Sequence, residues 1–449
     1  MLRVLRYLAV ILCFFVLFSF SGCGVPGGAK GKNTLTIWHW MTDRDSVFQE
    51  LAKKYEENTG IKVNFELYAP SDQYSQKIRA AAQGQTLPDI FGVLGETRDF
   101  ASFIKAGYIL DLTPYMDENN SAWRNKFSVK ALAVDEFAED NSYGVKRGVY
   151  GVPLDIVTIQ MVYNKTLLKQ LGFDPESPPK NFAQFLDIGK KISAINSGGS
   201  AENYGGKAAK LQGLVSGWAE FWMIDCLANN FAFNIMGKDK VLSTIRGEVP
   251  YTTPEWIEVL TLFQQMQDSG VLADGVVTMI NKTAEQLFAN GKAVFAFNGS
   301  WCVNVYKAMN PDLDYAVMLV PRVSDKFPLA VWGGAGSSFM INAASKNKEA
   351  AVRFLQWITD TEQQAYLVEK TNNLPANQEI LRKSPEALAG FAKAIDYSTH
   401  PNIWGVSEFP SVIEAWDRGI QAIILGKKTP KQVAAEVQKI KERELSKKR

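Results

Sequence analysis

Trp38, His39 and Trp40 follow one another where a predicted strand ends, and Asp43 comes soon after them. Flat aromatic rings can cover the apolar face of a small molecule, whereas a carboxylate accepts hydrogen bonds from its hydroxyl groups. This combination at the end of a strand indicates the wall of a binding site. The alternative is core packing, because a strand of a parallel sheet is buried on both faces. At least one of the three rings is therefore expected to lie in the core.

Further candidates are tryptophans that stand beside glycine, asparagine or glutamate, and polar residues in or after predicted strands. They are Glu96, Arg98, Asp155, Trp222, Trp301, Trp332, Gly333, Gly334 and Trp404. Asp155 has apolar neighbours on both sides, and an unpaired buried carboxylate costs several kcal/mol. It therefore needs a partner, either a hydroxyl group of a ligand or a backbone amide. For the tryptophans the alternative is the core, and for Glu96 and Arg98 it is an exposed helix N-terminus.

The chain has few residues arranged for catalysis or metal binding. Its two histidines, His39 and His400, lie far apart in the sequence and outside any metal-binding motif. No G-x-S-x-G motif or phosphate-binding glycine loop occurs at a strand-to-helix turn. Cys226 and Cys302 form either a disulfide or two buried free thiols. We therefore predict no catalytic residues, no metal and no cofactor.

The chain has 449 residues, a formal net charge of +2 and 46% hydrophobic residues. This length predicts two or three domains with a large core. Positive and negative residues are interleaved along the whole chain, whereas a protein that binds nucleic acid would have a basic stripe. The composition therefore favours an ordinary globular protein without a nucleic-acid partner.

Residues 1–22 are expected to form an export signal. Arg3 and Arg6 precede an apolar stretch that is shorter than the roughly 20 residues of a membrane-spanning helix. The run from Phe20 to Cys23 resembles a bacterial lipobox, although Phe20 stands where an aliphatic residue is usual. On this interpretation Cys23 is the lipid anchor, with acyl chains such as palmitate, and residues 23–32 form a flexible tether. The alternative is an ordinary signal peptide with a chance cysteine.

Hydrophobic periodicity predicts an alternation of strands and helices in the first part of the chain. The predicted strands lie at 35–40, 61–68 and 88–94, and helices are predicted at 71–83 and 96–106. A further helix is capped by Asp43 or Asp45 and stops at Gly60. This order is typical of an α/β fold with a parallel sheet and helices on both faces. The almost uninterrupted apolar stretch 150–165 predicts a buried extended segment or a crossing between two lobes.

A family resemblance extends from Leu35 to about Lys441. The segments that carry it are LTIWHW, YEENTGIKV, LPDIFGV, AGYILDLTPY, YGVPLDIVTIQMVYNK, LFANGKAVFAFNGSW, WGGAGSSFMINAASKNKEAAVRFLQWI and ILGKKTPKQVAAEV. No single segment is specific, whereas their order and spacing are. Together they resemble the extracellular solute-binding proteins of carbohydrate ABC importers, the family 1 proteins related to maltose-binding proteins.

The resemblance implies a type II periplasmic-binding-protein-like fold. Such a fold has two α/β lobes, each a mainly parallel sheet flanked by helices, with the ligand cleft between them. Lobe 1 would comprise residues 33–150 and 333–385, and lobe 2 would comprise 151–332 and 386–449. Trp301, in the NGSW segment, matches the family position of a tryptophan that stacks on the sugar. Polar ligand contacts often follow the third strand, where Glu96 and Arg98 stand.

The resemblance also implies partners and a location. The protein would capture a sugar or oligosaccharide outside the cytoplasmic membrane and deliver it to the permease subunits of an ABC transporter. It would be exported, lipid-anchored and monomeric, and not an enzyme. The identity of the sugar depends on the shape of the pocket and is not predicted. Two alternatives remain: a thiaminase-like enzyme on the same fold with Cys302 or Cys226 as nucleophile, and a receptor or adhesin lipoprotein without a transport partner.

Overall fold

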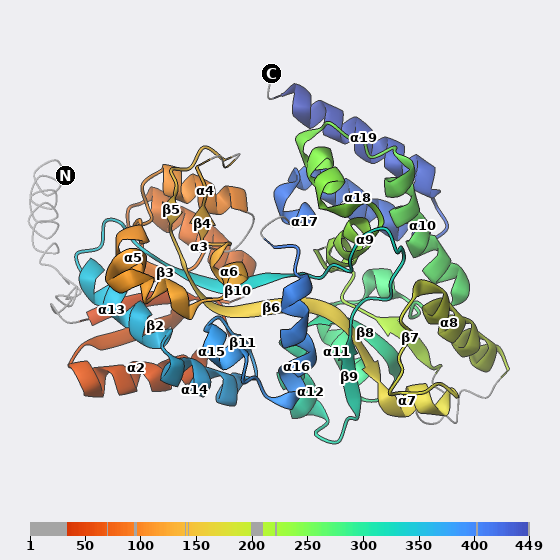
Figure 1. Ribbon diagram of the computed structural model, residues 1–449, viewed down its shortest axis with the longest axis horizontal. Helices are drawn as coiled ribbons and strands as arrows, with labels where there is room; N and C mark the ends of the chain where they lie inside the picture. Colours follow the sequence, from red (N-terminus) through yellow and green to blue (C-terminus); the bar gives the residue numbers. More distant parts are fainter. Residues whose placement is uncertain are drawn as a thin grey trace, which may run out of the picture.

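The computed structural model describes residues 34–69, 71–93, 97–139, 141, 143–198, 210–220, 222–400 and 403–447. The predicted export signal, the lipobox cysteine Cys23 and the tether lie outside these residues. The described chain forms two α/β lobes that lie side by side and are joined by strands passing between them (Figure 1). The helices in these ranges are all too short or too polar to cross a membrane.

The first lobe is built on parallel strands. β1 (Thr34–His39) pairs with β2 (Lys62–Leu67) on one side and with β3 (Ile90–Phe91) on the other. Helix α2 (Asp45–Thr59) has apolar residues every three or four positions, and they form one buried face. Phe48 of this face stacks on Phe65 of β2, with ring centroids 4.9 Å apart. The predicted alternation of strands and helices is confirmed here.

Two long strands connect the lobes. β6 (Val152–Asn164) and β10 (Trp332–Ile341) pair antiparallel, with Ile159 opposite Trp332 and Val152 opposite Phe339. β10 also pairs with β3 of the first lobe, whereas β6 pairs with β8 (Ala293–Gly299) and β9 (Tyr315–Met318) of the second. The stretch 150–165, predicted as a buried extended segment or a crossing between lobes, thus contains the crossing strand β6, and β10 crosses beside it (Figure 1).

The second lobe contains the parallel pair of β7 (Gln212–Val215) and β8, covered by long helices. The longest of these helices are α8 (Phe182–Ser197), α9 (Trp222–Arg246), α10 (Pro254–Ser269), α18 (Pro410–Ile424) and α19 (Pro430–Ser446), and the shorter α12 (Cys302–Met309) follows β8. Within the described residues the main sheet has nine strands: seven in the order β2-β1-β3-β10-β6-β8-β7, with β9 and β11 (Leu374–Pro375) each pairing with β6. In this sheet the parallel pairs lie in the two lobes, and every antiparallel pair includes a crossing strand.

Shorter elements complete the described chain. They are α3 (Ser71–Gln83), α4 (Thr97–Lys105), α5 (Thr113–Ser121), the 3₁₀ helix η1 (Arg124–Lys126), α6 (Val129–Leu132), β4 (Glu136–Phe137), β5 (Gly148–Val149), α7 (Lys165–Gln170), η3 (Val276–Thr278), α11 (Asn281–Ala289), α13 (Lys348–Ile358), α14 (Thr361–Thr371), α15 (Gln378–Leu381), α16 (Glu386–Lys393), η4 (Ala394–Tyr397) and α17 (Trp404–Ser407). The segment after η4 lies beside the start of β10, where Val331 pairs with Ser398. The exact lobe boundaries stay a prediction.

Candidate ligand-binding cleft

A cavity of about 430 Å³ is lined by residues of both lobes and of both crossing strands. Its lining residues are Trp40, Met41, Thr42, Asp43, Arg44, Asp155, Val157, Trp222, Trp301, Asn304, Val305, Trp332, Gly336, Ser337, Thr371 and Asn373. The structure thus brings six of the predicted site residues to one place: Trp40, Asp43, Asp155, Trp222, Trp301 and Trp332. That they contact a ligand stays a prediction.

The ring of Trp301 is held by the NGSW segment itself. A Cβ atom on Gly299 would lie 1.9 Å from Cζ3 of the indole, so only glycine leaves room for the ring in this position. The side chain of Asn298 accepts a hydrogen bond of 2.8 Å from the backbone N–H of Gly299. The indole Nε1 donates to Oε1 of Glu285 at 3.2 Å. The ring is therefore fixed in orientation before any ligand arrives.

Glu285 holds more than the ring. Its Oε1 also accepts hydrogen bonds from Nδ2 of Asn281 at 2.9 Å and from Nδ2 of Asn298 at 3.1 Å. Burial raises the pKa of Glu285, and the bonds from Asn298, Trp301 and Asn281 act in the opposite direction. This carboxyl is a connection between helix α11, the end of β8 and the Trp301 side chain.

Three tryptophans of the second lobe and the start of β10 form an aromatic wall. The ring centroid of Trp222 lies 5.9 Å from that of Trp301 and 6.5 Å from that of Trp332, with interplanar angles of 50°. Trp222 is 39% exposed, which leaves much of its ring open to solvent. The wall offers apolar surface that a ligand can cover, and stacking on it contributes beyond the area buried.

The first lobe positions Trp40 in a similar way. A Cβ atom on Gly92, just after β3, would lie 2.3 Å from Cζ3 of this indole. The ring of Tyr74 packs against it with centroids 5.1 Å apart. The Tyr74 hydroxyl accepts a hydrogen bond of 2.9 Å from the Gly92 N–H and lies 3.0 Å from the carbonyl oxygen of Trp38. Each lobe thus places one tryptophan ring over a glycine at the carboxyl end of a strand.

Charged groups of the cavity are paired with one another. Arg44 donates from one guanidinium nitrogen to Oδ2 of Asp155 at 2.6 Å, and its Nε donates to Oδ2 of Asp43 at 3.1 Å. Asn373 adds a hydrogen bond of 3.0 Å to the same Asp43 oxygen. Burial alone would raise the pKa of Asp43, but Arg44 and Asn373 lower it below its ordinary value.

Asp155 keeps one oxygen without a partner. Its Oδ1 is buried and accepts no hydrogen bond within the described part of the chain. A Cβ atom on Gly336 would lie 2.9 Å from this oxygen, and Gly336 lines the cavity. Arg44 is therefore the partner of one oxygen of this buried carboxylate, where the sequence predicted a ligand hydroxyl or a backbone amide. That the second oxygen accepts a hydrogen bond from a ligand hydroxyl stays a prediction.

Two predicted contacts lie in the core instead. His39 is fully buried between Phe48 and Phe65, with its Nε2 3.0 Å from Oδ1 of Asp45. Burial lowers its pKa, although Asp45 opposes this. Trp404 is fully buried as well and donates from Nε1 to the hydroxyl of Tyr251 at 2.8 Å. The prediction that these two residues line the cavity is wrong, because both rings are buried in the core of the protein.

Trp38 also lies away from the cavity lining. Its ring contacts Tyr68 at 5.3 Å, and Nζ of Lys77 lies 4.2 Å from its centroid. Gly333 and Gly334 are sites of close approach, as their sequence predicts, but to protein groups. Gly333 packs on the carbonyl oxygen of Val157, and Gly334 packs on the ring of His400. Glu96 and the side chain of Arg98 lie outside the described residues.

Sequence reasoning missed several lining residues, of which Arg44 is the most consequential. Its partner Asp155 is 111 positions away in the chain, so no local pattern relates them. Asn304 and Asn373 enter the cavity from α12 and from the segment after α14. The signal for Asn304 was its place one turn after Trp301 on a helix that begins at the cavity.

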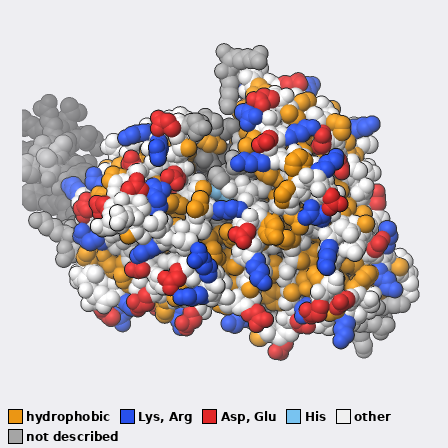
Figure 2. Space-filling model, in the orientation of Figure 1, with side chains coloured by type: hydrophobic (Ala, Val, Ile, Leu, Met, Phe, Trp, Pro, Cys, Tyr) orange, Lys and Arg blue, Asp and Glu red, His pale blue; other side chains and the backbone are white. Residues whose placement is uncertain are grey.

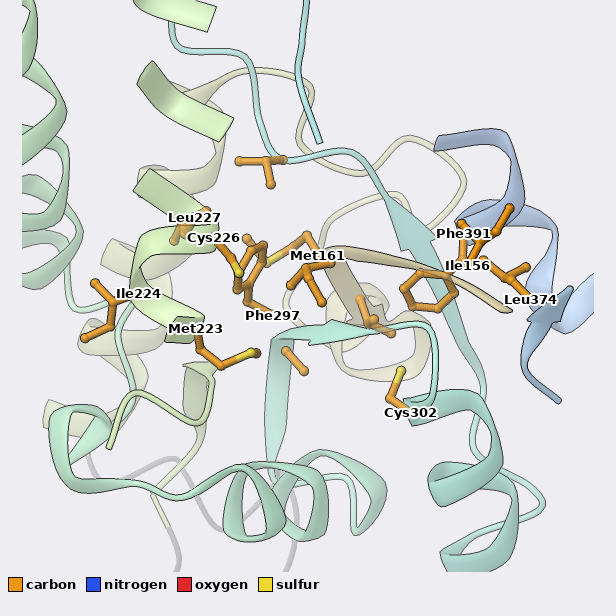
Figure 3. Packing of buried hydrophobic residues seen from close by; sticks show 14 of the residues in the cluster. Ile156, Met161, Met223, Ile224, Cys226, Leu227, Phe297, Cys302, Leu374 and Phe391 are labelled. Atoms are coloured by element: carbon orange, nitrogen blue, oxygen red, sulfur yellow. The ribbon is translucent and has the colours of Figure 1, made fainter. Parts of the chain in front are cut away.

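The two cysteines are free and fully buried. Figure 3 shows Cys226 among Met161, Leu227 and Phe297, and Cys302 at the start of a helix elsewhere in the same core. Burial raises the pKa of both thiols, and nearby carboxylates add to this effect. Among the described residues, no group of histidine, cysteine and acidic side chains is placed to hold a metal ion.

Family comparison agrees with this architecture. Residues 50–394 match the family described as bacterial extracellular solute-binding protein. This chain belongs to that family. A putative binding protein of Brucella abortus is 25% identical over 89% of this chain and 90% of its own length. A galactooligosaccharide-binding protein of Bacillus subtilis is 22% identical over 94% and 93% of the two chains. A maltooligosaccharide ABC transporter solute-binding lipoprotein of Streptococcus pneumoniae is 25% identical over 74% and 70%.

Solved structures show the same fold. A chitin oligosaccharide binding protein aligns with a TM-score of 0.70 and 21% identity, over 91% of this chain and 98% of its own. A maltose-bound protein of T. maritima aligns with a TM-score of 0.71 and 19% identity, over 91% and 99%. The two-lobed α/β architecture predicted for this chain is therefore confirmed, with the cavity at the carboxyl ends of strands, as expected in open α/β sheets.

Proposed function

We propose that this protein is the substrate-binding component of an ABC importer and that it binds a neutral sugar or oligosaccharide in the cavity described above. The observation that carries the proposal is the wall of Trp222, Trp301 and Trp332, which lines the same cavity as Trp40 of the other lobe and Asp155. A pyranose ring has an apolar face for such rings and a periphery of hydroxyl groups for the polar ones.

The charges of the cavity disfavour an anionic ligand. Arg44 is the one cationic side chain among the described lining residues, and it is already paired with the two carboxylates of Asp43 and Asp155. Hydroxyl groups can donate to the free oxygen of Asp155 without disturbing the ion pair. Ring contacts of about 0.5–1.5 kcal/mol each and a few charged hydrogen bonds suffice for the roughly 8 kcal/mol of a micromolar ligand.

The relatives support this ligand class. Two of them are named as galactooligosaccharide- and maltooligosaccharide-binding proteins, and the aligned structures include a maltose complex and a chitin oligosaccharide binding protein. Permease subunits are the partner that such a role requires, and a monomer is the expected solution state. Export and a lipid anchor at Cys23 complete the proposal, with support from the lipobox resemblance and from the lipoprotein of Streptococcus pneumoniae.

A thermal-shift screen over neutral mono- and oligosaccharides tests the proposal. A ligand at about a hundred times its dissociation constant stabilises the folded protein by about 2.7 kcal/mol. Trp301→Ala is the control, since it removes a ring of the wall and should abolish most of the shift. If no sugar shifts the melting temperature of the wild type, the ligand class is wrong.

Two alternatives are less favoured. A cysteine-dependent enzyme on this fold would need an accessible thiolate, whereas Cys226 and Cys302 are buried, have raised pKa values and do not line the cavity. A receptor without a transport partner would bind the same sugars, and co-purification with a permease separates it from an importer component.

A further inference from the structure

Two neighbouring asparagines of helix α9, Asn229 and Asn230, are buried in the second lobe. Their exposed fractions are 0% and 2%, whereas lysine, arginine and acidic side chains spread over the outer surface that Figure 2 shows. Asparagine is seldom buried so completely, because its amide carries two donor hydrogens and an acceptor oxygen that need partners away from water. The position of this pair therefore indicates backbone groups that depend on side-chain partners.

Asn230 holds the backbone of Trp332. Its Oδ1 accepts a hydrogen bond of 2.6 Å from the N–H of Trp332 and a longer one of 3.5 Å from Nδ2 of Asn229. Trp332 is the first residue of β10, so its N–H lies at the end of the ladder that this strand forms with β6. The ends of such elements open more easily than their centres. The amide of Asn230 therefore fixes the point at which β10 and its first side chain begin.

Asn229 holds the segment that lies beside this end of β10. Its Nδ2 donates to Oγ1 of Thr399 at 3.2 Å, and its Oδ1 accepts a hydrogen bond of 3.1 Å from the N–H of Trp404. The N–H of Thr399 donates in turn to the carbonyl oxygen of Val331 at 3.0 Å. The two asparagines thus bind the start of β10 both directly and through the segment paired with it.

Helix α9 consequently sets the place of two of the three rings of the aromatic wall. It carries Trp222 at its first position, and it holds Trp332 through Asn230. The centroids of these two rings lie 6.5 Å apart, and both side chains line the candidate cleft. A buried hydrogen bond between the helix and the strand end keeps the rings in this arrangement before a ligand arrives. Such preorganisation lowers the entropy that is lost on binding.

The structure assigns Asn230 as a positioning residue of the sugar site, which acts on the ligand through the ring of Trp332. Asn230 lies outside the cavity lining. Its Nδ2 is buried and has no hydrogen-bond partner in the described part of the chain, so the role belongs to the carbonyl oxygen. Aspartate, which keeps this acceptor, should therefore replace Asn230, whereas leucine of similar size should not. This inference rests on the proposed function and adds a residue outside the cavity on which affinity depends.

Fluorine NMR of the protein labelled with 5-fluorotryptophan tests the position of the ring without any ligand. Trp332→Phe identifies the resonance of Trp332. In Asn230→Leu that resonance should shift and broaden, and in Asn230→Asp it should stay close to its wild-type position. Asn234→Leu is the matched control, because Asn234 is equally buried on the same helix but binds the carbonyl oxygens of Ser324 and Phe327. It should leave the Trp332 resonance unchanged.

Calorimetric titration with trimers of glucose, galactose and N-acetylglucosamine measures the effect on binding. Asn230→Leu should weaken the trimer that the wild type binds by about two- to tenfold, the worth of one ring contact. Asn230→Asp should restore most of this affinity, and Asn234→Leu should not change it. In the Trp332→Ala background Asn230→Leu should cause no further loss, because the ring that it positions is gone. A melting curve of each variant verifies that it is folded, and Asn230→Ala is used if Asn230→Leu does not fold.

The outcomes separate this inference from the proposed function. If either the Trp332 resonance or the sugar affinity is unchanged in Asn230→Leu, or if Asn234→Leu changes both in the same way, the assignment of Asn230 is overturned while the sugar-binding function stands. If the wild type binds none of the trimers, the proposed function fails, and the role of Asn230 in binding fails with it. The resonance then still shows whether Asn230 holds the Trp332 ring.

Discussion

The guanidinium group of Arg44 lies 2.6 Å from Oδ2 of Asp155 and joins the turn after β1 to the crossing strand β6. Both side chains are almost fully buried, and both line the candidate cleft. Asp155 raises the pKa of Arg44 against the effect of burial, which alone would lower it. The pair therefore links the turn after β1 to the crossing strand at the candidate cleft, and Oδ1 of Asp155 is left without a hydrogen-bond partner in the described part of the chain.

Asp155→Asn should weaken both stability and ligand binding. Breaking one side of a buried ion pair costs about 3–5 kcal/mol, and the lower end applies because Arg44 keeps Asp43. The lost charge-assisted hydrogen bond should reduce affinity by about 1.5–3 kcal/mol. Urea unfolding and calorimetry measure the two effects. Asp187→Asn, in an exposed pair with Lys190, is the control and should change neither. If Asp155→Asn binds the sugar as tightly as the wild type, Oδ1 of Asp155 does not contact the ligand.

Gly299→Ala should disable the Trp301 ring without removing any of its atoms. The new methyl group would overlap Cζ3 of the indole, so the ring must leave its place on the aromatic wall. We expect sugar affinity to fall by about 1.5–3 kcal/mol, as for loss of a large apolar contact. A double-mutant cycle is the check: in the Trp301→Ala background, Gly299→Ala should cost no further affinity. Additive losses would mean that the glycine acts through another group.

Trp404→Ala should lower stability and leave sugar affinity unchanged, whereas Trp301→Ala should lower sugar affinity. Trp404 is fully buried against Trp256 and Trp416, with ring centroids 5.1 Å from each. Its loss should lower the free energy of unfolding by about 3–5 kcal/mol and leave the affinity of the folded protein unchanged. Melting curves and titrations below the melting temperature measure the two quantities. If Trp404→Ala has normal stability but binds sugar more weakly, Trp404 contacts the ligand after all.

Local patterns predicted the α/β class and the buried extended segment at 150–165, whereas the two lobes were predicted from the family resemblance. β6 is a long apolar run, and the NGSW segment carries its own ring support in Asn298 and Gly299. The alternation of side chains along β1 also indicated that His39 is buried, because it shares a face with the buried residues Leu35 and Ile37.

Contacts between residues that are far apart in the sequence could not be predicted from local patterns. Trp404 looked like a loop residue beside glycine, yet helices α10 and α18 bring Trp256 and Trp416 around it. The partner of Asp155 was expected to be a ligand or a backbone amide, and it is Arg44, more than a hundred residues away. Such pairings depend on how elements that are distant in the sequence pack together, and the spacing of residues along the chain does not predict that packing.

The two thiols should be inert in the folded protein. Cys226 and Cys302 are fully buried and their pKa values are raised, so neither offers a thiolate to a reagent. We expect no reaction with an aromatic disulfide reagent under native conditions and release of thiol after denaturation. Cys302→Ala should keep sugar binding. Rapid labelling of native protein at Cys302 would revive the enzyme alternative.

Cys23→Ala should release the protein from membranes. If Cys23 is the acylated N-terminus, the variant lacks the chains that hold it, each buried methylene contributing about 0.8 kcal/mol. Cell fractionation of the wild type and the variant, with metabolic labelling by palmitate, measures the change. A Cys13→Ala variant is the matched control, because Cys13 lies within the predicted signal. Equal membrane retention of wild type and Cys23→Ala would contradict the lipobox.

Asp135 makes the free energy of unfolding of the protein dependent on pH. It is 1% exposed, and its Oδ1 lies 2.2 Å from where a Cβ atom on Gly151 would be, just before β6. Its Oδ2 accepts a hydrogen bond of 2.8 Å from the hydroxyl of Ser338 on β10. Burial raises the pKa of Asp135 to about 7, although the bond from Ser338 lowers it somewhat. The folded protein therefore holds a proton that the unfolded chain, with a pKa of about 3.9, releases.

The sign of the pH dependence follows from this difference. Between about pH 4 and pH 7 the folded state binds the proton and the unfolded state does not, so this group makes stability fall as pH rises. The slope is at most about 1.4 kcal/mol per pH unit and vanishes above the folded pKa. Asp135→Asn should remove this part of the slope, and Ser338→Ala should extend it to higher pH because the donor that favours the ionised form is gone. Urea unfolding at intervals from about pH 5 to pH 8 measures all three proteins. Parallel profiles for wild type and Asp135→Asn would show that Asp135 is ionised in the folded protein throughout.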